Sequence, residues 1–175
     1  MASTLKIEDG TVVSNANSYG TLVEAAAYHT LYGNTDWDGD DATLDNAMLT
    51  AMRSLELLYG PRLVGYRLSA TQDLSFPRYM FTDHLGKLHT QSSIPSRIKE
   101  AQFELALMHL MGTDLFPEEN QSTGIAQESV KVGDIQTSTT YTKQAKKSTF
   151  DGFRKIDITL YPLLKVNGPI LAFSR

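Results

Sequence analysis

The sequence predicts a mainly α-helical fold, a small bundle of about three to four helices with a projecting β-hairpin and extended N- and C-terminal arms. Segments with a continuous apolar face at helical spacing predict the bundle, and two β-prone runs near residue 133 predict the hairpin. The chain has 175 residues, of which 41% are hydrophobic and 21% are charged. These values are typical of one soluble globular domain of ordinary size.

The first two predicted helices are marked by their ends and by an apolar face. Thr21 and Glu24 form a capping-box pattern at the start of the first helix, and Gly33 favours its end. A second helix follows and stops at the dipeptide Gly60-Pro61. Its apolar residues recur at the spacing of one buried face: Leu44, Ala47, Met48, Ala51, Leu55, Leu58 and Tyr59.

A third helix is expected to begin at Pro95, where the missing N–H of proline does no harm, and to end near Met111. It carries apolar residues on two sides, which is typical of the central helix of a bundle. Residues 61–93 mix aromatic, arginine and turn residues without a sustained period. We therefore expect a structured loop between the second and third helices.

The C-terminal third predicts a hairpin and a last short helix. Residues 130–132 and 135–141 are β-prone runs around the turn pair Gly133-Asp134. Apolar residues from Ile156 to Leu164 favour a short helix whose length Pro162 limits. The chain then divides into an N-terminal arm (1–20), a helical body (21–127), a β-hairpin (128–142) and a basic C-terminal tail (143–175).

Charge is distributed unevenly along the chain. Residues 1–129 carry 8 Lys and Arg against 17 Asp and Glu, a net charge of −9, whereas residues 130–175 carry 8 against 3, a net charge of +5. A basic tail on an acidic body suits self-association or an acidic partner, although a solvated surface with uneven charge explains it equally well.

A lone hairpin is only marginally stable in water, so we expect the hairpin and the basic tail to pack on other molecules. Val130, Val132 and Ile135 supply little apolar surface, and the lysines face an acidic body. The predicted interface residues, toward neighbouring copies or a larger assembly, are Val130, Val132, Ile135, Tyr141, Lys143, Lys146, Lys147, Arg154 and Lys155.

Catalytic and metal chemistry find little support. The absence of Cys excludes disulfides, thiol catalysis and cysteine metal sites, and no nucleophile elbow, phosphate loop or dinucleotide fingerprint is present. We therefore expect a non-enzymatic protein with no catalytic residue, no metal site and no cofactor. No apolar run approaches the ~18 residues of a membrane span, so no membrane partner is expected.

The segment from Asn34 to Asp45 resembles a calcium loop in the spacing of its carboxylates around Gly39. It departs from that pattern in having Asn first and Asp, rather than Glu, last. The alternative, which we favour, is a turn whose Asp residues cap the second helix. Trp37 in the same segment is the only Trp; it would either seal the loop over the core or anchor an interface.

Residues 59–81 suggest a nucleic-acid site. Aromatic rings that stack on bases alternate there with guanidinium groups that pair with phosphates. The alternative is a loop held to the core by aromatic residues, and the net charge of −9 over residues 1–129 argues against nucleic acid. The candidate DNA-contacting residues are Arg62, Arg67 and Arg78, interleaved with Tyr59, Tyr66, Phe76, Tyr79 and Phe81.

An ordered set of motifs resembles a family of phage and prophage proteins labelled DnaT-like. The set covers most of residues 7–135, and the tail matches less well. It consists of Glu8-Asp-Gly10, Asn15-Ala-Asn-Ser-Tyr19, Glu24-Ala-Ala-Ala-Tyr28-His29, Gly33-Asn34-Thr35 with Trp37, Leu74-Ser-Phe-Pro77-Arg78, Ile94-Pro95, Ala101-Gln-Phe-Glu104-Leu-Ala106 and Val130-Lys-Val-Gly133.

The label implies a single-stranded DNA-binding replication accessory protein. The organisation also looks like the head-to-tail connector adaptors of tailed phages, and this resemblance supplies our main expectation. It implies a structural virion protein of the neck, made in the bacterial cytoplasm, with about a dozen copies in a ring. The implied partners are other copies, the portal protein and a tail or nozzle protein, while genome DNA passes through the lumen without sequence-specific contact. Single-stranded DNA binding is the alternative.

Overall fold

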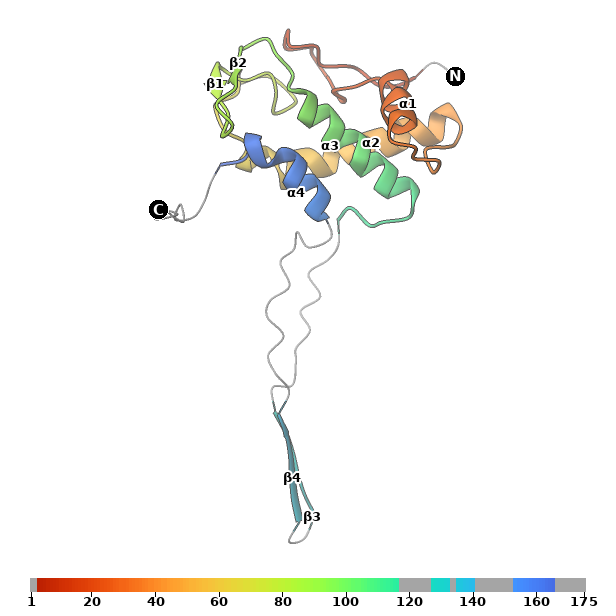
Figure 1. The fold of residues 1–175 in the computed structure, drawn as a ribbon, viewed down its shortest axis with the longest axis vertical. Helices are drawn as coiled ribbons and strands as arrows, with labels where there is room; N and C mark the ends of the chain where they lie inside the picture. Colours follow the sequence, from red (N-terminus) through yellow and green to blue (C-terminus); the bar gives the residue numbers. More distant parts are fainter. Residues whose placement is uncertain (1–2, 117–126, 133–134, 141–152, 166–175) are drawn as a thin grey trace. The chain divides into compact units, whose positions relative to one another are not determined.

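The computed structural model describes residues 3–116, 127–132, 135–140 and 153–165. The chain divides into two compact units, one formed by Met1–Phe116 with Lys155–Arg175 and the other by Pro117–Arg154. Within the described residues the fold is mainly helical, with four α-helices and short antiparallel hairpins (Figure 1). The predicted fold class is confirmed.

Helix α1 (Leu22–Leu31) begins with the predicted capping box. The Glu24 backbone N–H donates to the Thr21 hydroxyl at 3.1 Å, and the Thr21 backbone N–H donates to the Glu24 carboxylate at 2.8 Å. The helix ends before Gly33, whose φ of +68° lies in the left-handed region that favours glycine. Both ends of α1 are therefore encoded locally.

Helices α2 (Asp41–Leu58) and α3 (Ser96–Leu110) form the centre of the body (Figure 1). Asp40 caps α2, because its carboxylate accepts the Thr43 backbone N–H at 2.8 Å. The predicted apolar face of α2 lies inward, and α3 is buried around most of its circumference, as expected of a central helix. The fully buried apolar residues of the pair include Ala47, Met48, Ala51, Leu55, Ile98, Ala101, Leu105 and Ala106.

Helix α4 (Arg154–Leu160) and the 3₁₀ turn η3 (Tyr161–Leu163) pack on the same core, so this part of the expected tail belongs to the body. Ile156, Leu160 and Leu163 are fully buried. Lys155 forms an ion pair of 2.7 Å with Glu104 of α3. The short helix predicted from the apolar residues Ile156 to Leu164 is present, and its apolar face joins it to the body.

Residues 3–20, the expected N-terminal arm, also lie on the body. Tyr19 is fully buried, and its backbone N–H donates to Gln102 of α3 at 2.9 Å. The Asp45 carboxylate at the start of α2 accepts hydrogen bonds from the Ser3 hydroxyl and from the Thr4 backbone N–H and hydroxyl. The segment is extended, but its described part is held by α2 and α3.

The expected loop between α2 and α3 has more structure than its sequence indicates. It contains the 3₁₀ turn η1 (Gly60–Arg62) and a small antiparallel hairpin of β1 (Phe81–Thr82) and β2 (Leu88–His89). The buried Asp83 carboxylate accepts the backbone N–H groups of Leu85 and Lys87 and lies 2.9 Å from His89. These contacts form the turn of the β1–β2 hairpin.

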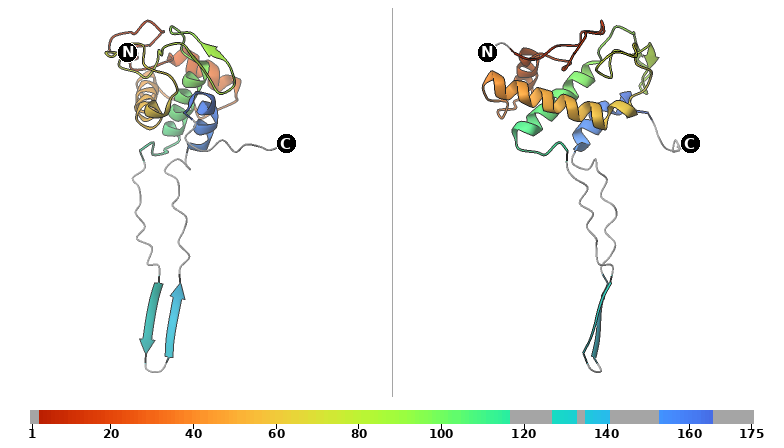
Figure 2. Two further views of the ribbon diagram at one scale, coloured as in Figure 1. Left: turned by 90° about the vertical axis from the view of Figure 1, so that its left-hand side faces the viewer. Right: turned by 180° about the vertical axis from the view of Figure 1, so that it is seen from behind.

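In the second unit, β3 (Gln127–Val132) and β4 (Ile135–Thr140) form the predicted antiparallel hairpin (Figure 2). Val132 is opposite Ile135, and Val130 is opposite Thr137.

Candidate nucleic-acid interface

Three segments distant in sequence meet beyond the end of α2: residues 62–67, 78–84 and 161–165. The Val64 backbone N–H donates to the Leu163 carbonyl at 2.9 Å, and the Lys165 N–H donates to the Arg62 carbonyl at 2.7 Å. The His84 N–H donates to the Pro162 carbonyl at 3.1 Å. Backbone pairing therefore joins the α2–α3 loop to the segment after α4.

Two tyrosines of this region form a cross-strand pair. Arg67 and Arg78 make an antiparallel bridge, and the Tyr79 N–H donates to the Tyr66 carbonyl at 2.9 Å. In this register Tyr66 and Tyr79 are opposite each other on one face, with Cβ atoms roughly 5 Å apart. Tyr66 is 81% exposed and Tyr79 is 53% exposed, so both rings face solvent.

A third exposed tyrosine and several cations lie on the adjoining segments. Tyr161, at the start of η3, is 58% exposed, and Lys165 is exposed. Arg62 pairs with Asp157 at 3.4 Å, and Arg67 pairs with Glu56 at 3.7 Å, with both arginine side chains partly exposed. We call the set Tyr66, Tyr79, Tyr161, Arg62, Arg67 and Lys165 the tyrosine surface.

Arg78 does not lie on this surface but supports it from the interior of the protein. It is buried, and its guanidinium donates to the carbonyl oxygens of Gly60, Leu63, Val64 and Gly65 at 2.8–3.3 Å. Burial lowers the pKa of Arg78 from its ordinary value. One side chain thus ties the turn after α2 to the strand that carries Tyr79.

A buried polar network fixes the same loop to the helices. The Tyr19 hydroxyl donates to the Glu56 carboxylate at 2.9 Å and accepts the Phe76 N–H at 2.9 Å. The Ser75 hydroxyl and backbone N–H also donate to Glu56, at 2.7 and 2.9 Å. Burial raises the pKa of Tyr19, so its hydroxyl keeps its proton and remains a donor at neutral pH.

A protein-family model described as "Putative DnaT-like ssDNA binding protein" matches residues 3–174. The chain belongs to this family. No curated protein and no solved structure matches the chain. The DnaT-like part of the resemblance drawn from the sequence motifs is therefore confirmed.

The family assignment contradicts the connector-adaptor part of that resemblance. The matching family is described by DNA binding, whereas the adaptor expectation placed the protein in a virion neck with portal and tail partners. It also contradicts passage of DNA through a ring lumen without contact. Sequence motifs of the body led to the correct family, and general organisation led to the wrong assembly.

The structure separates the candidate DNA-contacting residues of the DnaT-like chain into two groups. Arg62 and Arg67 lie on the tyrosine surface and Arg78 lies beneath it. Of the five interleaved aromatic residues, Tyr66 and Tyr79 are exposed, Phe81 is half-buried, and Tyr59 and Phe76 belong to the core. Phe81 stacks on His89 with ring centroids 4.9 Å apart.

Sequence reasoning missed Tyr161 and Lys165, because it assigned them to a tail. The apolar residues on either side of Pro162 are the sequence feature that could have located them, because they predict a turn packed on a core. Backbone pairing of residues 62–64 with 163–165 then places Lys165 beside Arg62, while the Tyr161 ring lies 6.3 Å from the ring of His84.

The predicted interface residues of the C-terminal third lie in several separate segments of the chain. Val130, Val132 and Ile135 lie in β3 and β4, while Arg154 and Lys155 begin α4. Arg154 is exposed and Lys155 pairs with Glu104. The remaining predicted residues, Tyr141, Lys143, Lys146 and Lys147, lie outside the described residues.

The calcium-like segment serves as a helix cap, the alternative that we favoured. Asp40 caps α2, and Asp45 accepts three hydrogen bonds from Ser3 and Thr4. The described residues contain no group of three or more His, Asp or Glu side chains that could hold a metal ion. Trp37 stacks on His29 with ring centroids 4.5 Å apart and so covers the core beside α1.

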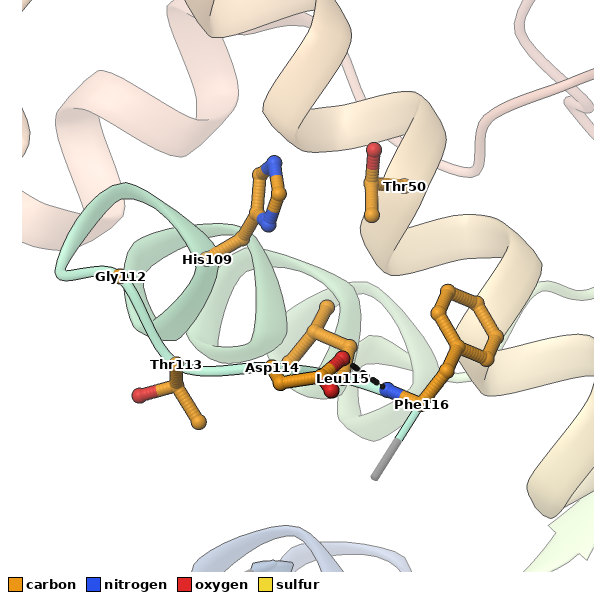
Figure 3. A pocket seen from close by; sticks show the side chains of 7 residues that line it. All are labelled: Thr50, His109, Gly112, Thr113, Asp114, Leu115 and Phe116. Atoms are coloured by element: carbon orange, nitrogen blue, oxygen red, sulfur yellow. Dashed lines mark hydrogen bonds between the residues drawn. The ribbon is translucent and has the colours of Figure 1, made fainter. Parts of the chain in front are cut away.

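A shallow depression of about 240 Å³ lies at the C-terminal end of α3 (Figure 3). Thr50 of α2 and His109 of α3 line one side, and the Phe116 N–H donates to the Asp114 carboxylate at 2.8 Å on the other. It is remote in sequence from the tyrosine surface and shares no residue with it. Among the described residues, no helix is both long and apolar enough to span a membrane.

Proposed function

We propose that this DnaT-like chain binds single-stranded DNA at the tyrosine surface. The observation that carries the proposal is the solvent-facing pair of Tyr66 and Tyr79, held opposite each other by backbone pairing on a loop that also carries the partly exposed Arg62 and Arg67. The description of the family, which names single-stranded DNA binding, supports the same activity. We infer a binding role without bond-breaking chemistry, because the surface presents aromatic and cationic groups.

Exposed tyrosine rings provide stacking platforms for unpaired bases. Stacking of a base on an aromatic ring contributes roughly 1–3 kcal/mol and tolerates any sequence, since every base has a flat face. Tyr66 and Tyr79 lie on a backbone tied down by Arg78 and by the Tyr19–Glu56 network. The loop therefore loses little conformational freedom when a base binds.

Arg62, Arg67 and Lys165 supply the positive charge for the phosphates. The Arg62–Asp157 and Arg67–Glu56 pairs are long and partly exposed, and such surface pairs contribute only about 0–1 kcal/mol. A phosphate can replace each carboxylate as the partner of the arginine, with a shorter charge-assisted hydrogen bond. The net charge of −4 does not prevent phosphate binding at this surface, because exposed acidic residues concentrate elsewhere in the chain, notably at residues 36–41.

The site favours single strands over duplex DNA. Stacking on Tyr66 and Tyr79 requires bases that are free of a partner strand, and neither ring belongs to a helix that could enter a major groove. Contacts to ring faces and to phosphates do not distinguish one base sequence from another. Binding is therefore expected to be independent of sequence and to weaken with salt.

Titration of a fluorescein-labelled oligodeoxythymidine, followed by anisotropy, tests the proposal. Tyr66→Ala combined with Tyr79→Ala should weaken binding by at least about tenfold, the equivalent of roughly one stacked base. The matched control is Tyr32→Ala, which removes a similarly exposed tyrosine at the end of α1. Contacts to about three phosphates predict a slope near −2 in a plot of log affinity against log salt.

Arg67→Gln should make that slope shallower by about 0.7, the contribution of one phosphate on a single strand. Two results would overturn the proposal: equal loss of affinity in Tyr32→Ala and the double variant, or binding of duplex as tightly as of single strands.

A further inference from the structure

Helix α1 presents an apolar stripe to solvent. Val23 is 79% exposed and Leu31 is 77% exposed, and Ala26, Ala27 and Thr30 between them are exposed as well. These positions follow the spacing of one helix face, which in a surface helix normally carries charged and polar residues. The stripe thus has the composition of a buried face without a described partner.

The exposed stripe is the outer face of α1, because the helix has a second face that packs inward. Ala25 and His29 are buried, and the Tyr28 hydroxyl donates to the Glu104 carboxylate of α3 at 2.8 Å. Burial and the Glu104 contact raise the pKa of the Tyr28 hydroxyl, which therefore stays protonated. With its inner face fixed on α3, α1 cannot rotate to bury Val23 and Leu31.

An acidic segment is held against the C-terminal half of α1. The Asn34 N–H donates to the His29 carbonyl at 2.9 Å, and Trp37 stacks on the His29 ring. The four aspartates around Trp37 are all exposed: Asp36, Asp38, Asp40 and Asp41. The C-terminal end of the α1 dipole adds further negative potential at this position.

The described cations near α1 are paired with other carboxylates. Residues 7–52 contain no Lys or Arg. Lys99, on the neighbouring turn of α3, pairs with Glu24 at 2.8 Å, and Lys155 pairs with Glu104 at 2.7 Å. The stripe is therefore apolar along its length, and a segment with four exposed aspartates follows the C-terminal end of α1.

We propose that the outer face of α1, together with the acidic segment at residues 36–41, is a docking surface for a cationic amphipathic helix of a partner protein. Val23 and Leu31 would contact apolar residues spaced over two turns of the partner helix, and small Ala26 and Ala27 between them allow helix axes to approach within about 8–10 Å. The proposal is independent of DNA binding.

Charge complementarity decides among possible occupants. Lys or Arg on the flanks of the partner helix would face the aspartates, which improves both the rate and the specificity of association. Nucleic acid and anionic lipid surfaces are repelled by the same aspartates. A cationic protein helix satisfies both the apolar stripe and the acidic end.

Calorimetric titration with synthetic helical peptides tests this surface, and Trp37 emission reports binding locally. The probe is an amphipathic peptide with Leu and Ala on one face and Lys on both flanks, compared with a peptide in which Glu replaces every Lys. We expect the Lys peptide to bind and the Glu peptide not to bind. Val23→Gln combined with Leu31→Gln should lower the affinity for the Lys peptide by about tenfold or more.

Leu57→Gln is the matched control, because Leu57 is an exposed leucine on α2 and should leave binding unchanged. Asp36→Asn combined with Asp38→Asn should weaken binding at low salt and match the wild type at high salt, where charges are screened. Circular dichroism checks that every variant remains folded.

Equal binding of the Lys peptide to the wild type and to the Val23/Leu31 variant would overturn the proposal, as would equal binding of the Glu peptide. Concentration-dependent association of the protein alone, abolished in the Val23/Leu31 variant, would overturn it too, because the occupant would then be a second copy of the chain.

Discussion

The loop region that carries Tyr66 and Tyr79 and helix α1 lie at opposite ends of the helical body, as Figure 1 and the right-hand view of Figure 2 both show. Both expose apolar side chains, but their charges have opposite sign. The loop of Tyr66 and Tyr79 also carries Arg62 and Arg67, whereas the segment that follows Val23 and Leu31 carries four exposed aspartates. The two faces are therefore suited to different classes of partner, nucleic acid in one case and cationic protein in the other.

This contrast shows why charge summed along the sequence misleads. The net charge of −9 over residues 1–129 argues against DNA binding only if the charge is spread evenly. Much of it belongs to the segment at residues 36–41, beside α1, or to carboxylates such as Glu104 and Asp45 that are occupied inside the body. At the tyrosine surface the three cations Arg62, Arg67 and Lys165 outnumber the two carboxylates, Glu56 and Asp157, that pair with the arginines.

Replacement of a buried residue of α4 should have the largest effect, because α4 anchors one side of the tyrosine surface. Leu160→Ala removes a fully buried side chain and should lower the free energy of unfolding by about 3 kcal/mol in a urea titration. Ile158→Ala is the control: Ile158 is exposed on the same helix, and its loss should change stability by less than about 0.5 kcal/mol. Equal effects of the two variants would mean that α4 does not pack as described.

Arg78→Met should have the next largest effect and should act on one face only. It removes the guanidinium that four carbonyl groups share, two of them buried, so the free energy of unfolding should fall by about 2–3 kcal/mol. DNA affinity should fall as well, because the strand carrying Tyr79 loses its anchor. Arg67→Met should weaken DNA binding while leaving stability nearly unchanged, and the Lys peptide should bind both variants as it binds the wild type. Loss of DNA affinity without loss of stability in Arg78→Met would instead place Arg78 in direct contact with phosphate.

Lowering the pH to mildly acidic values should have the smallest effect on stability, and this effect should arise from His29 of α1. Burial lowers the pKa of His29, so the folded state holds the neutral ring while the unfolded state takes up a proton below its pKa of about 6.5. Stability is then full above that value and decreases as the pH falls through the window below it. His29→Gln should flatten this dependence between about pH 7 and pH 5 in urea titrations. An unchanged pH profile in the variant would show that His29 carries no such linkage.

Local rules predicted the helices well and the site incompletely. The capping box of Thr21 and Glu24 and the apolar face of α2 depend on neighbours within one or two turns, and both are confirmed. Arg67 and Arg78 share the same local surroundings of aromatic residues, yet one is exposed and the other buried. That difference depends on where the carbonyls of residues 60–65 lie in space, which residue spacing does not specify.

The C-terminal part of the chain shows the same limit of prediction from local sequence. Lys155 looked like part of a basic tail, but a buried Glu104 fifty residues away supplies its partner. Tyr161 and Lys165 join the tyrosine surface because residues 163–165 pair with residues 62–64. Long-range pairing of this kind is decided by the assembled core, and composition alone pointed away from it.

Fluorine NMR on protein labelled with 3-fluorotyrosine tests the central claim most directly, because each tyrosine is its own probe of contact with DNA. On addition of oligodeoxythymidine, a site at the tyrosine surface predicts that the signals of Tyr66, Tyr79 and Tyr161 shift together with the same saturation point. The signals of Tyr19, buried under α2, and of Tyr32, at the end of α1, should stay in place. Shifts at Tyr32 with none at Tyr66 and Tyr79 would contradict the proposed site.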